Sequence, residues 1–282
     1  MAAKNFSVEF YQINLVGDKI QPFENYLEHL LEDYKPDYTK PFFGEIHKSA
    51  GFNHWHGTIN LVKKDYLPQI FNTDKAIARN MALEDSEGLL SVCAFMYVPK
   101  NKLLLVLKDF GAPGFSLLLE RVKTKNELEK CEADILLKKE MYDKLSKAKE
   151  IKSFAFKAAR IAPDALSKED SAIDFIQSLQ GISYGEISVT LKSRKGNELT
   201  YSWVKRLVDV FKRQPQETVK DLKVTVGGDN ERKGEILNML DYAFVTKVTM
   251  TTLDKTVQLD ERERALEKAY QDAQDDLTEL GL

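Results

Sequence analysis

Residues 182–226 read ISYGEISVTLKSRKGNELTYSWVKRLVDVFKRQPQETVKDLKVTV, and this stretch decides the fold of the second half of the chain. Apolar residues at 187, 189 and 191 alternate with polar ones, the period-2 pattern of a half-buried strand. From Leu199 to Phe211 apolar residues recur every three or four positions, so we expect an amphipathic helix that ends before Pro215. Alternation resumes at Leu222. The order of strand, crossover helix and parallel strand predicts a split βαβ unit.

The sequence before this stretch predicts a domain built on an antiparallel sheet. Apolar spacing of three and four residues predicts a helix at 20–34, and a shorter one is expected at 115–122. Short polar connections between strands are typical of hairpins. Residues 1–122 are therefore interpreted as an N-terminal α+β domain, which sets the fold class of the protein as α+β. Its strands are expected at 6–16, 41–48, 54–62, 89–99 and 103–107.

Three further segments complete the expected organisation. Thr124 and Glu127 have the spacing of a capping box, and the charged sequence after them predicts a connector helix over 123–151. Residues 152–253 are interpreted as a C-terminal βαβ-containing domain. Apolar residues at helical spacing predict an acidic amphipathic helix within 254–282. Additional strands are expected at 153–159 and 242–252, and additional helices at 168–179 and 231–240.

Composition indicates a globular protein of the cell interior. The chain has 282 residues, 43% of them hydrophobic, which is enough for two domains with a core. Cys93 and Cys131 lie far apart in apolar surroundings, so we expect a reducing compartment and no disulfide framework. The sequence begins without a signal-peptide pattern and has no apolar run near the ~20 residues needed to cross a bilayer. We therefore expect a cytoplasmic protein without direct membrane insertion.

Charge is distributed unevenly along the chain, although the formal net charge is only −3. Residues 186–223 contain nine Lys or Arg and five acidic residues, whereas residues 257–282 contain three and eight. An acidic protein can therefore carry a basic face. The acidic C-terminal helix is interpreted as packing on its own domain. The alternatives are a dimer contact or an autoinhibitory arm over the basic face.

The basic face is the candidate site for nucleic acid. Lys205 and Lys212 begin two pairs of adjacent cations that are two helical turns, or about 11 Å, apart. Cations at such spacing can contact successive phosphates without reading bases, so we expect sequence-nonspecific binding to the DNA backbone. The alternative is a solvated crossover helix on which Asp209 neutralises part of the charge. The candidate residues are Lys192, Arg194, Lys195, Lys205, Arg206, Lys212, Arg213, Lys220 and Lys223.

Three of the four histidines lie in the first predicted hairpin. His54 and His56 point to one face of a strand, and the hairpin can place His47 or Glu45 beside them, a set that a metal would accept. No ligand set at a recognised spacing supports this, so we assign no metal and leave metal binding by the three histidines open. The alternative is a set of exposed histidines around Trp55 as a core anchor.

No motif for catalysis or cofactor binding is found in the sequence. Residues 227–230, GGDN, follow a strand, where backbone amides can hold a phosphate. They lack the lysine of a P-loop, and neither a GxGxxG nor a GxSxG motif is present. We assign no catalytic residue and no cofactor. An enzyme with a dispersed site is the less favoured alternative.

The order of several elements along the chain forms a recognisable layout. Its features are the helix at 23–34, the strand with EIHK at 45–48, the hairpin at 91–107 leading into Phe110 and a short helix, and the strand at 187–192 with its basic segment and charged tail. This layout resembles the RexA-like phage exclusion proteins and, more loosely, the KwaB-like DNA-binding subunits of anti-phage systems. The resemblance implies a cytoplasmic homodimer that binds DNA nonspecifically, with a membrane-protein partner in the phage case. The alternative is a protein-interaction or adaptor module that binds no nucleic acid.

Overall fold

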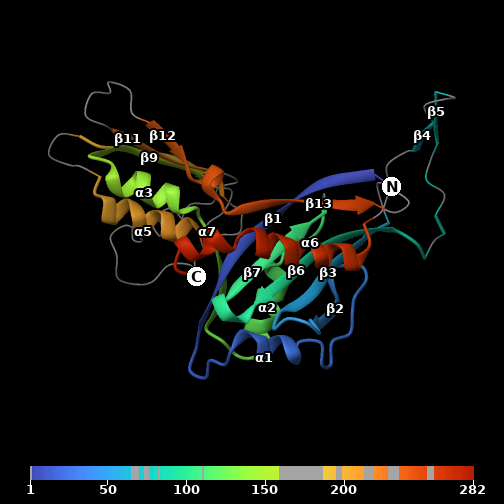
Figure 1. Cartoon of the computed structure of the whole chain (residues 1–282). Helices are drawn as coiled ribbons and strands as arrows, with labels where there is room; N and C mark the ends of the chain where they lie inside the picture. Colours follow the sequence, from blue (N-terminus) through green and yellow to red (C-terminus); the bar gives the residue numbers. More distant parts are fainter. Residues whose placement is uncertain are drawn as a thin grey trace. The chain divides into compact units, whose positions relative to one another are not determined.

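The computed structural model divides the chain into two compact units (Figure 1). The first comprises Met1–Glu9, Ile13–Cys131 and Thr246–Asp272, and the second comprises Phe10–Gln12, Glu132–Val245 and Ala273–Leu282. Both helices and sheets are present, so the protein belongs to the α+β class. The structure describes residues 2–64, 70–72, 76–79, 81, 83–84, 86–109, 111–158, 187–194, 199–212, 219–227, 235–252 and 257–282.

The first unit is built on a sheet with the strand order β13-β1-β7-β6-β3-β2, in which β8 also pairs with β1. Strands β2 and β3 form an antiparallel hairpin, and so do β6 and β7, which confirms both predicted hairpins. A small separate pair consists of β4 (Ile70–Asn72) and β5 (Ile77–Arg79). The main strands are β1 (Ala2–Val16), β2 (Phe42–Lys48), β3 (Trp55–Lys63), β6 (Leu89–Val98), β7 (Leu103–Lys108) and β13 (Val245–Thr252). Strand β8 (Lys130–Ile135) begins in this unit, and its residues from Glu132 onward belong to the second.

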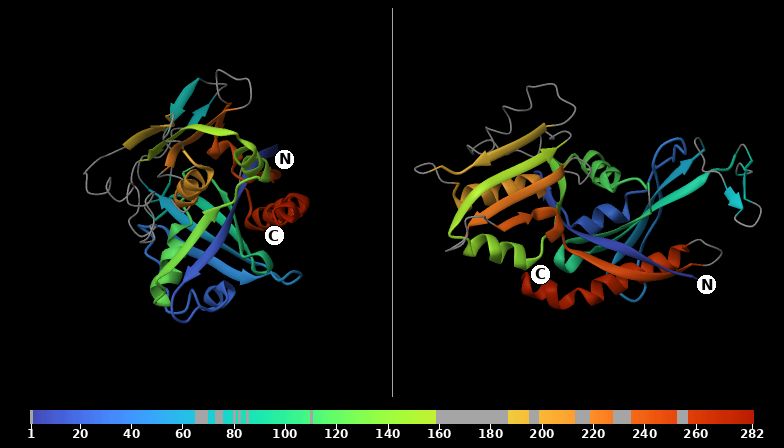
Figure 2. Two further views of the ribbon diagram at one scale, coloured as in Figure 1. Left: turned by 90° about the vertical axis from the view of Figure 1, so that its left-hand side faces the viewer. Right: turned by 90° about the horizontal axis from the view of Figure 1, so that it is seen from above.

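Helices cover both faces of this sheet. Helix α6 (Leu259–Asp272) lies on one face, and helices α1 (Phe23–Glu28) and α2 (Ser116–Lys125) lie on the other (Figure 2). The central strand β7 therefore buries every residue from Leu103 to Leu107, although a half-covered strand would bury only alternate ones. The side chains of β7 are thus buried on both faces of the sheet, and the core of the first unit extends over both faces.

The second unit contains a four-stranded antiparallel sheet with the order β10-β9-β11-β12. Strands β10 and β11 each pair antiparallel with β9, one on either side, so they run parallel to each other with β9 between them. Helix α5 connects β10 to β11, which confirms the split βαβ arrangement. The elements are α3 (Lys139–Lys147), β9 (Glu150–Ala158), β10 (Ile187–Lys192), α5 (Tyr201–Lys212), β11 (Val219–Gly227), β12 (Glu235–Asn238) and α7 (Gln274–Glu279).

Helix α5 packs on one face of this sheet through the apolar stripe expected from the sequence. Val204, Leu207 and Phe211 are buried, and the Phe211 ring lies 4.4 Å from the Phe156 ring of β9, measured between centroids. Helix α3 lies on the same side of the sheet (Figure 1). A 3-10 turn, Met239–Tyr242, follows β12.

The predicted connector helix over 123–151 is wrong. This segment contains the end of α2, strand β8, helix α3 and the start of β9. Glu127 has a φ of 53°, in the left-handed region that interrupts a helix. In β8 the buried residues alternate with half-buried charged ones, so the period of the segment is two rather than 3.6. The buried residues are Cys131, Ala133 and Ile135.

Other expectations have mixed outcomes. The predicted helix at 231–240 is wrong where it is described, because Leu237 pairs with Val224 of β11 in a strand. The helix expected at 20–34 forms only over Phe23–Glu28. Helical structure within 254–282 is confirmed by α6 and α7. The predicted helix at 168–179 lies outside the described residues, and the domain boundaries remain a prediction. Within the described part of the chain, no helix combines the length and apolar character needed to span a membrane.

Candidate functional site

Helix α5 holds the first part of the candidate nucleic-acid site. Its N-terminal turn is capped by Thr200, whose hydroxyl accepts a hydrogen bond from the backbone N–H of Trp203 at 3.3 Å. Lys205 and Arg206 lie on the exposed side, opposite the buried stripe. The packing of α5 on the sheet therefore fixes the backbone from which these two cations project.

The end of β10 holds the second part. Strand β10 is an edge strand of the sheet, and Lys192 and Arg194 near its end are exposed. The backbone N–H of Ser193 donates to the carbonyl of Lys152 on β9 at 2.8 Å, which keeps this end of the strand paired. Lys192, Arg194 and Lys205 form no ion pair with any residue that the structure describes.

The sheet separates the candidate residues into two groups. Paired residues on neighbouring strands point to the same face, and Leu191 and Val224 are both paired with Phe154, on the α5 side. Because side chains alternate along a strand, Lys192 and Lys223 point to the other face. The structure therefore does not bring the candidate residues together on one flat surface. Lys192 and Lys223 share the sheet face opposite α5, whereas the exposed cations of α5 lie on the far side of the helix.

The half-buried Lys223 differs from the exposed Lys192, Arg194 and Lys205 because it has a described acidic partner. Its ammonium lies 2.6 Å from the carboxylate of Asp221 on the same strand. The sheet face opposite α5 also carries Lys157 of β9, which is paired in register with Asp221 and with Ser188. Our sequence interpretation missed Lys157, although the alternation of β9 placed it on the polar face. The net charge of this face is thus lower than its lysines alone suggest.

Part of the candidate set cannot be placed. Lys195 and Arg213 lie outside the described residues, as do the side chains of Lys212 and Lys220. The proposed neutralisation by Asp209 also concerns a side chain outside the described part. Within the described residues, the candidate site therefore consists of the end of β10 and the first half of α5.

The histidines form a second cluster, in the first unit, beneath α6. Nδ1 of His54 and Nε2 of His56 both donate to the carboxylate of Glu267, at 2.9 and 3.0 Å. Nε2 of His47 lies 3.5 Å from a carboxylate oxygen of Glu263. The histidines that the sequence grouped on one hairpin thus face two glutamates from a helix more than 200 residues away.

This arrangement changes the interpretation of the histidines. Nδ1 of His54 and Nε2 of His56, the nitrogens that would bind a shared metal ion, instead donate hydrogen bonds to Glu267. Burial raises the pKa of Glu267, but the hydrogen bonds and charges of the two histidines outweigh burial and lower the pKa to about 2. Among the described residues, no group of three or more His, Cys, Asp or Glu is arranged to hold a metal ion.

A buried ion pair anchors the same helix. The guanidinium of Arg262 donates two hydrogen bonds of 2.9 Å to the two carboxylate oxygens of Asp109. Asp109 also accepts from the backbone N–H of Val92 at 3.2 Å. Ala265 and Leu266 are buried on the inner side of α6. These contacts favour the interpretation of α6 as a helix packed on its own sheet.

Comparisons with known proteins add no assignment to these clusters, because the chain matches no protein-family model and no curated protein sequence.

Proposed function

We propose that the second unit binds the phosphate backbone of nucleic acid through the end of β10 and the exposed side of α5, without reading base sequence. The observation that supports this most directly is that Lys192, Arg194 and Lys205 are exposed and have no ion-pair partner among the described residues. Arg206 adds a fourth exposed cation beside Lys205.

The geometry suits a backbone contact better than a base contact. The cations lie on two separate surfaces, at the end of β10 and on the exposed side of α5, and contacts from such separate cations can neutralise phosphates but carry no sequence information. Each phosphate that a cation neutralises releases a counterion, so affinity falls as salt rises. Lys223, held by Asp221, is expected to contribute little.

A cellular role in phage exclusion or anti-phage defence is part of the same proposal, and the resemblance of the element order supports it. So does the expectation of a homodimer, because two copies would place two cationic edges on one duplex and raise avidity. A membrane-protein partner is proposed on the same ground. A plaque assay that compares the wild type with a binding-deficient variant tests this role.

Fluorescence anisotropy with a labelled DNA duplex over a salt series tests the binding proposal. The wild type is expected to bind at low salt and to weaken steeply as salt increases. The variants K192E/R194E and K205E/R206E should each weaken binding and flatten the salt dependence by about one unit of slope per lost phosphate contact. A labelled RNA duplex of the same sequence establishes which nucleic acid is preferred.

The matched control is K19E/K35E, which makes the same change in net charge on exposed lysines of the first unit. It should leave binding close to that of the wild type. Equal weakening by all three variants would mean that net charge alone matters and would reject the proposed surface. No binding at low salt would reject nucleic acid as the ligand, and the adaptor alternative would then be tested by partner capture.

A further inference from the structure

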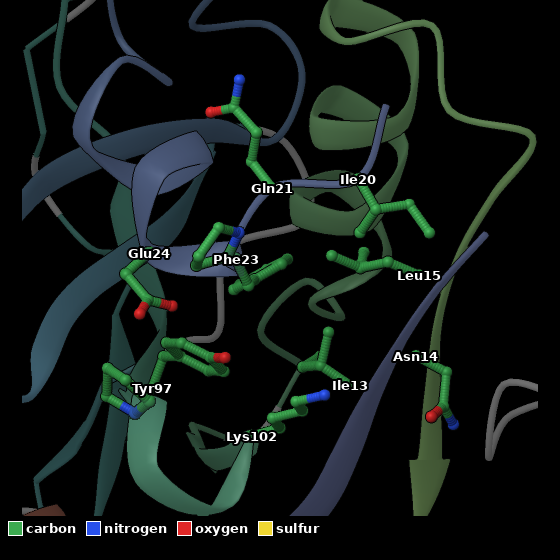
Figure 3. Close-up of a pocket in the computed structure, with 11 residues that line it drawn as sticks. Ile13, Asn14, Leu15, Ile20, Gln21, Phe23, Glu24, Tyr97 and Lys102 are labelled. Atoms are coloured by element: carbon green, nitrogen blue, oxygen red, sulfur yellow. The ribbon is translucent and has the colours of Figure 1, made fainter. Parts of the chain in front are cut away.

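A cavity of about 460 Å³ lies in the first unit, between β1, the segment before α1 and the turn between β6 and β7 (Figure 3). Its volume falls within the range of about 300–1,000 Å³ typical of small-molecule sites. Ile13 and Phe23 form buried apolar walls, whereas Ile20 at the rim is 51% exposed. A large exposed apolar side chain at the rim of the cavity suits a ligand with an apolar body.

The inner end of the cavity is formed by Tyr97. Its side chain is buried, its ring lies 4.8 Å from that of Phe23 between centroids, and its hydroxyl points into the cavity (Figure 3). This hydroxyl makes no hydrogen bond to any residue that the structure describes. Burial, and then the nearby charge of Glu24, raise the pKa of Tyr97, so the group stays protonated and can donate to a bound molecule.

Opposite charges stand on two sides of the cavity. Glu24 projects from α1 and Lys102 from the turn after β6, with Tyr97 between them (Figure 3). The two charges form no ion pair with each other or with another described residue. A cavity with some apolar walls, an acid on one side and a base on the other is complementary to a zwitterion that has an apolar body.

The position of Lys102 supports a role for its side chain. Its φ of 54° and ψ of 36° are left-handed, at the end of a 3-10 turn where glycine or asparagine is usual. Its carbonyl accepts from the N–H of Ile13 at 2.9 Å, which ties the turn to β1. In the segment before α1, the N–H of Gln21 donates to the hydroxyl of the buried Tyr26 at 2.8 Å. These contacts hold the walls in place without a ligand.

We propose that this cavity binds a small zwitterion with an apolar body, of the kind represented by a hydrophobic dipeptide. Its ammonium group lies toward Glu24, its carboxylate toward Lys102, and the Tyr97 hydroxyl donates to a polar atom between them. The side chains of the ligand cover Phe23 and Ile20.

Isothermal titration calorimetry with the dipeptide Leu-Phe tests the proposal. The wild type is expected to bind it, and N-acetyl-Leu-Phe and Leu-Phe amide should each bind at least tenfold more weakly because each lacks one charge. E24Q should weaken Leu-Phe tenfold but leave N-acetyl-Leu-Phe unchanged. K102M should weaken Leu-Phe tenfold but leave Leu-Phe amide unchanged. The matched controls E28Q and K100M alter exposed neighbours outside the cavity and should stay within twofold of the wild type.

Two further variants separate binding from folding. K102G removes the strained left-handed lysine, so it should raise the thermal midpoint while it abolishes the tenfold preference for a free carboxylate. Y97F removes a hydroxyl that has no partner in the described protein, so it should weaken Leu-Phe severalfold without lowering the thermal midpoint. Absence of Leu-Phe binding at millimolar concentration, or binding that neither E24Q nor K102M weakens, would overturn the proposal.

Discussion

The two sheets of this protein differ in whether the charged side chains near them form ion pairs. In the first unit helices cover both faces, and the charges beneath α6 are paired, as with Arg262 and Asp109. In the second unit α5 covers one face, and Lys192 and Lys205 remain exposed without an ion pair among the described residues. A buried charge without a partner costs several kcal/mol, whereas an exposed one is solvated by water. Pairing in the first unit therefore serves the fold, and exposed charge in the second is available to a ligand.

The largest expected effect concerns the covered face of the second sheet. Phe211→Ala empties the contact with Phe156 and should lower the free energy of unfolding by about 3–5 kcal/mol. Ile236→Ala alters a side chain that is 64% exposed on the same sheet and should change it by less than about 0.5 kcal/mol. Urea denaturation followed by the fluorescence of Trp203 measures both. Similar losses in the two variants would contradict a one-sided core.

The next effect concerns the buried ion pair of the first unit. Arg262→Met leaves the carboxylate of Asp109 without its partner and should cost about 3 kcal/mol of stability. The double variant R262M/D109L removes both charges and should recover a substantial part of that loss. Urea denaturation followed by circular dichroism completes the double-mutant cycle. A double variant as unstable as R262M would show that packing, rather than the uncompensated charge, dominates.

A smaller effect depends on pH through Glu267. Its pKa is lowered from the ordinary value of 4.5 to about 2 in the folded protein, so its stabilising contribution is present above pH 4.5 and is lost as pH falls toward 2. The urea midpoint of the wild type should decrease across this window. Glu267→Gln should be less stable above pH 4.5 and should show a smaller decrease below it. If the urea midpoints of the wild type and of E267Q change with pH in parallel, Glu267 does not contribute to the acid sensitivity of the first unit.

The smallest effect compares two lysines within the second unit. Lys205→Gln should weaken binding to a DNA duplex by up to about fivefold, in line with the 0.2–1 kcal/mol of an exposed charge contact. Lys223→Gln should have less than about a twofold effect because Asp221 already engages this ammonium. Anisotropy at one low salt concentration measures both. A larger loss for Lys223 than for Lys205 would place the binding surface on the sheet face that carries Lys192 and Lys223 rather than on α5.

The sequence predicted well those elements whose signal is local. The two hairpins and the stripe of α5 follow from the spacing of apolar residues over a few positions. The segment around Cys131 was misassigned because its few apolar residues fit a sparse helical stripe almost as well as the alternation of β8. Only pairing with β1, which is remote in sequence, selects the strand. The sequence indicated which residues of β10 and α5 are cationic candidates, but it did not indicate that the sheet separates them.

What the sequence by itself determined is the α+β character of the chain, the split βαβ order and the concentration of positive charge around α5, because periodicity and composition are properties of neighbouring residues. What only the tertiary structure decided is which strand lies between β10 and β11, which face each lysine occupies, and the meeting of Glu267 with His54 and His56. The physical reason is that such contacts depend on the packing of whole elements, and no local pattern records where a distant segment will dock.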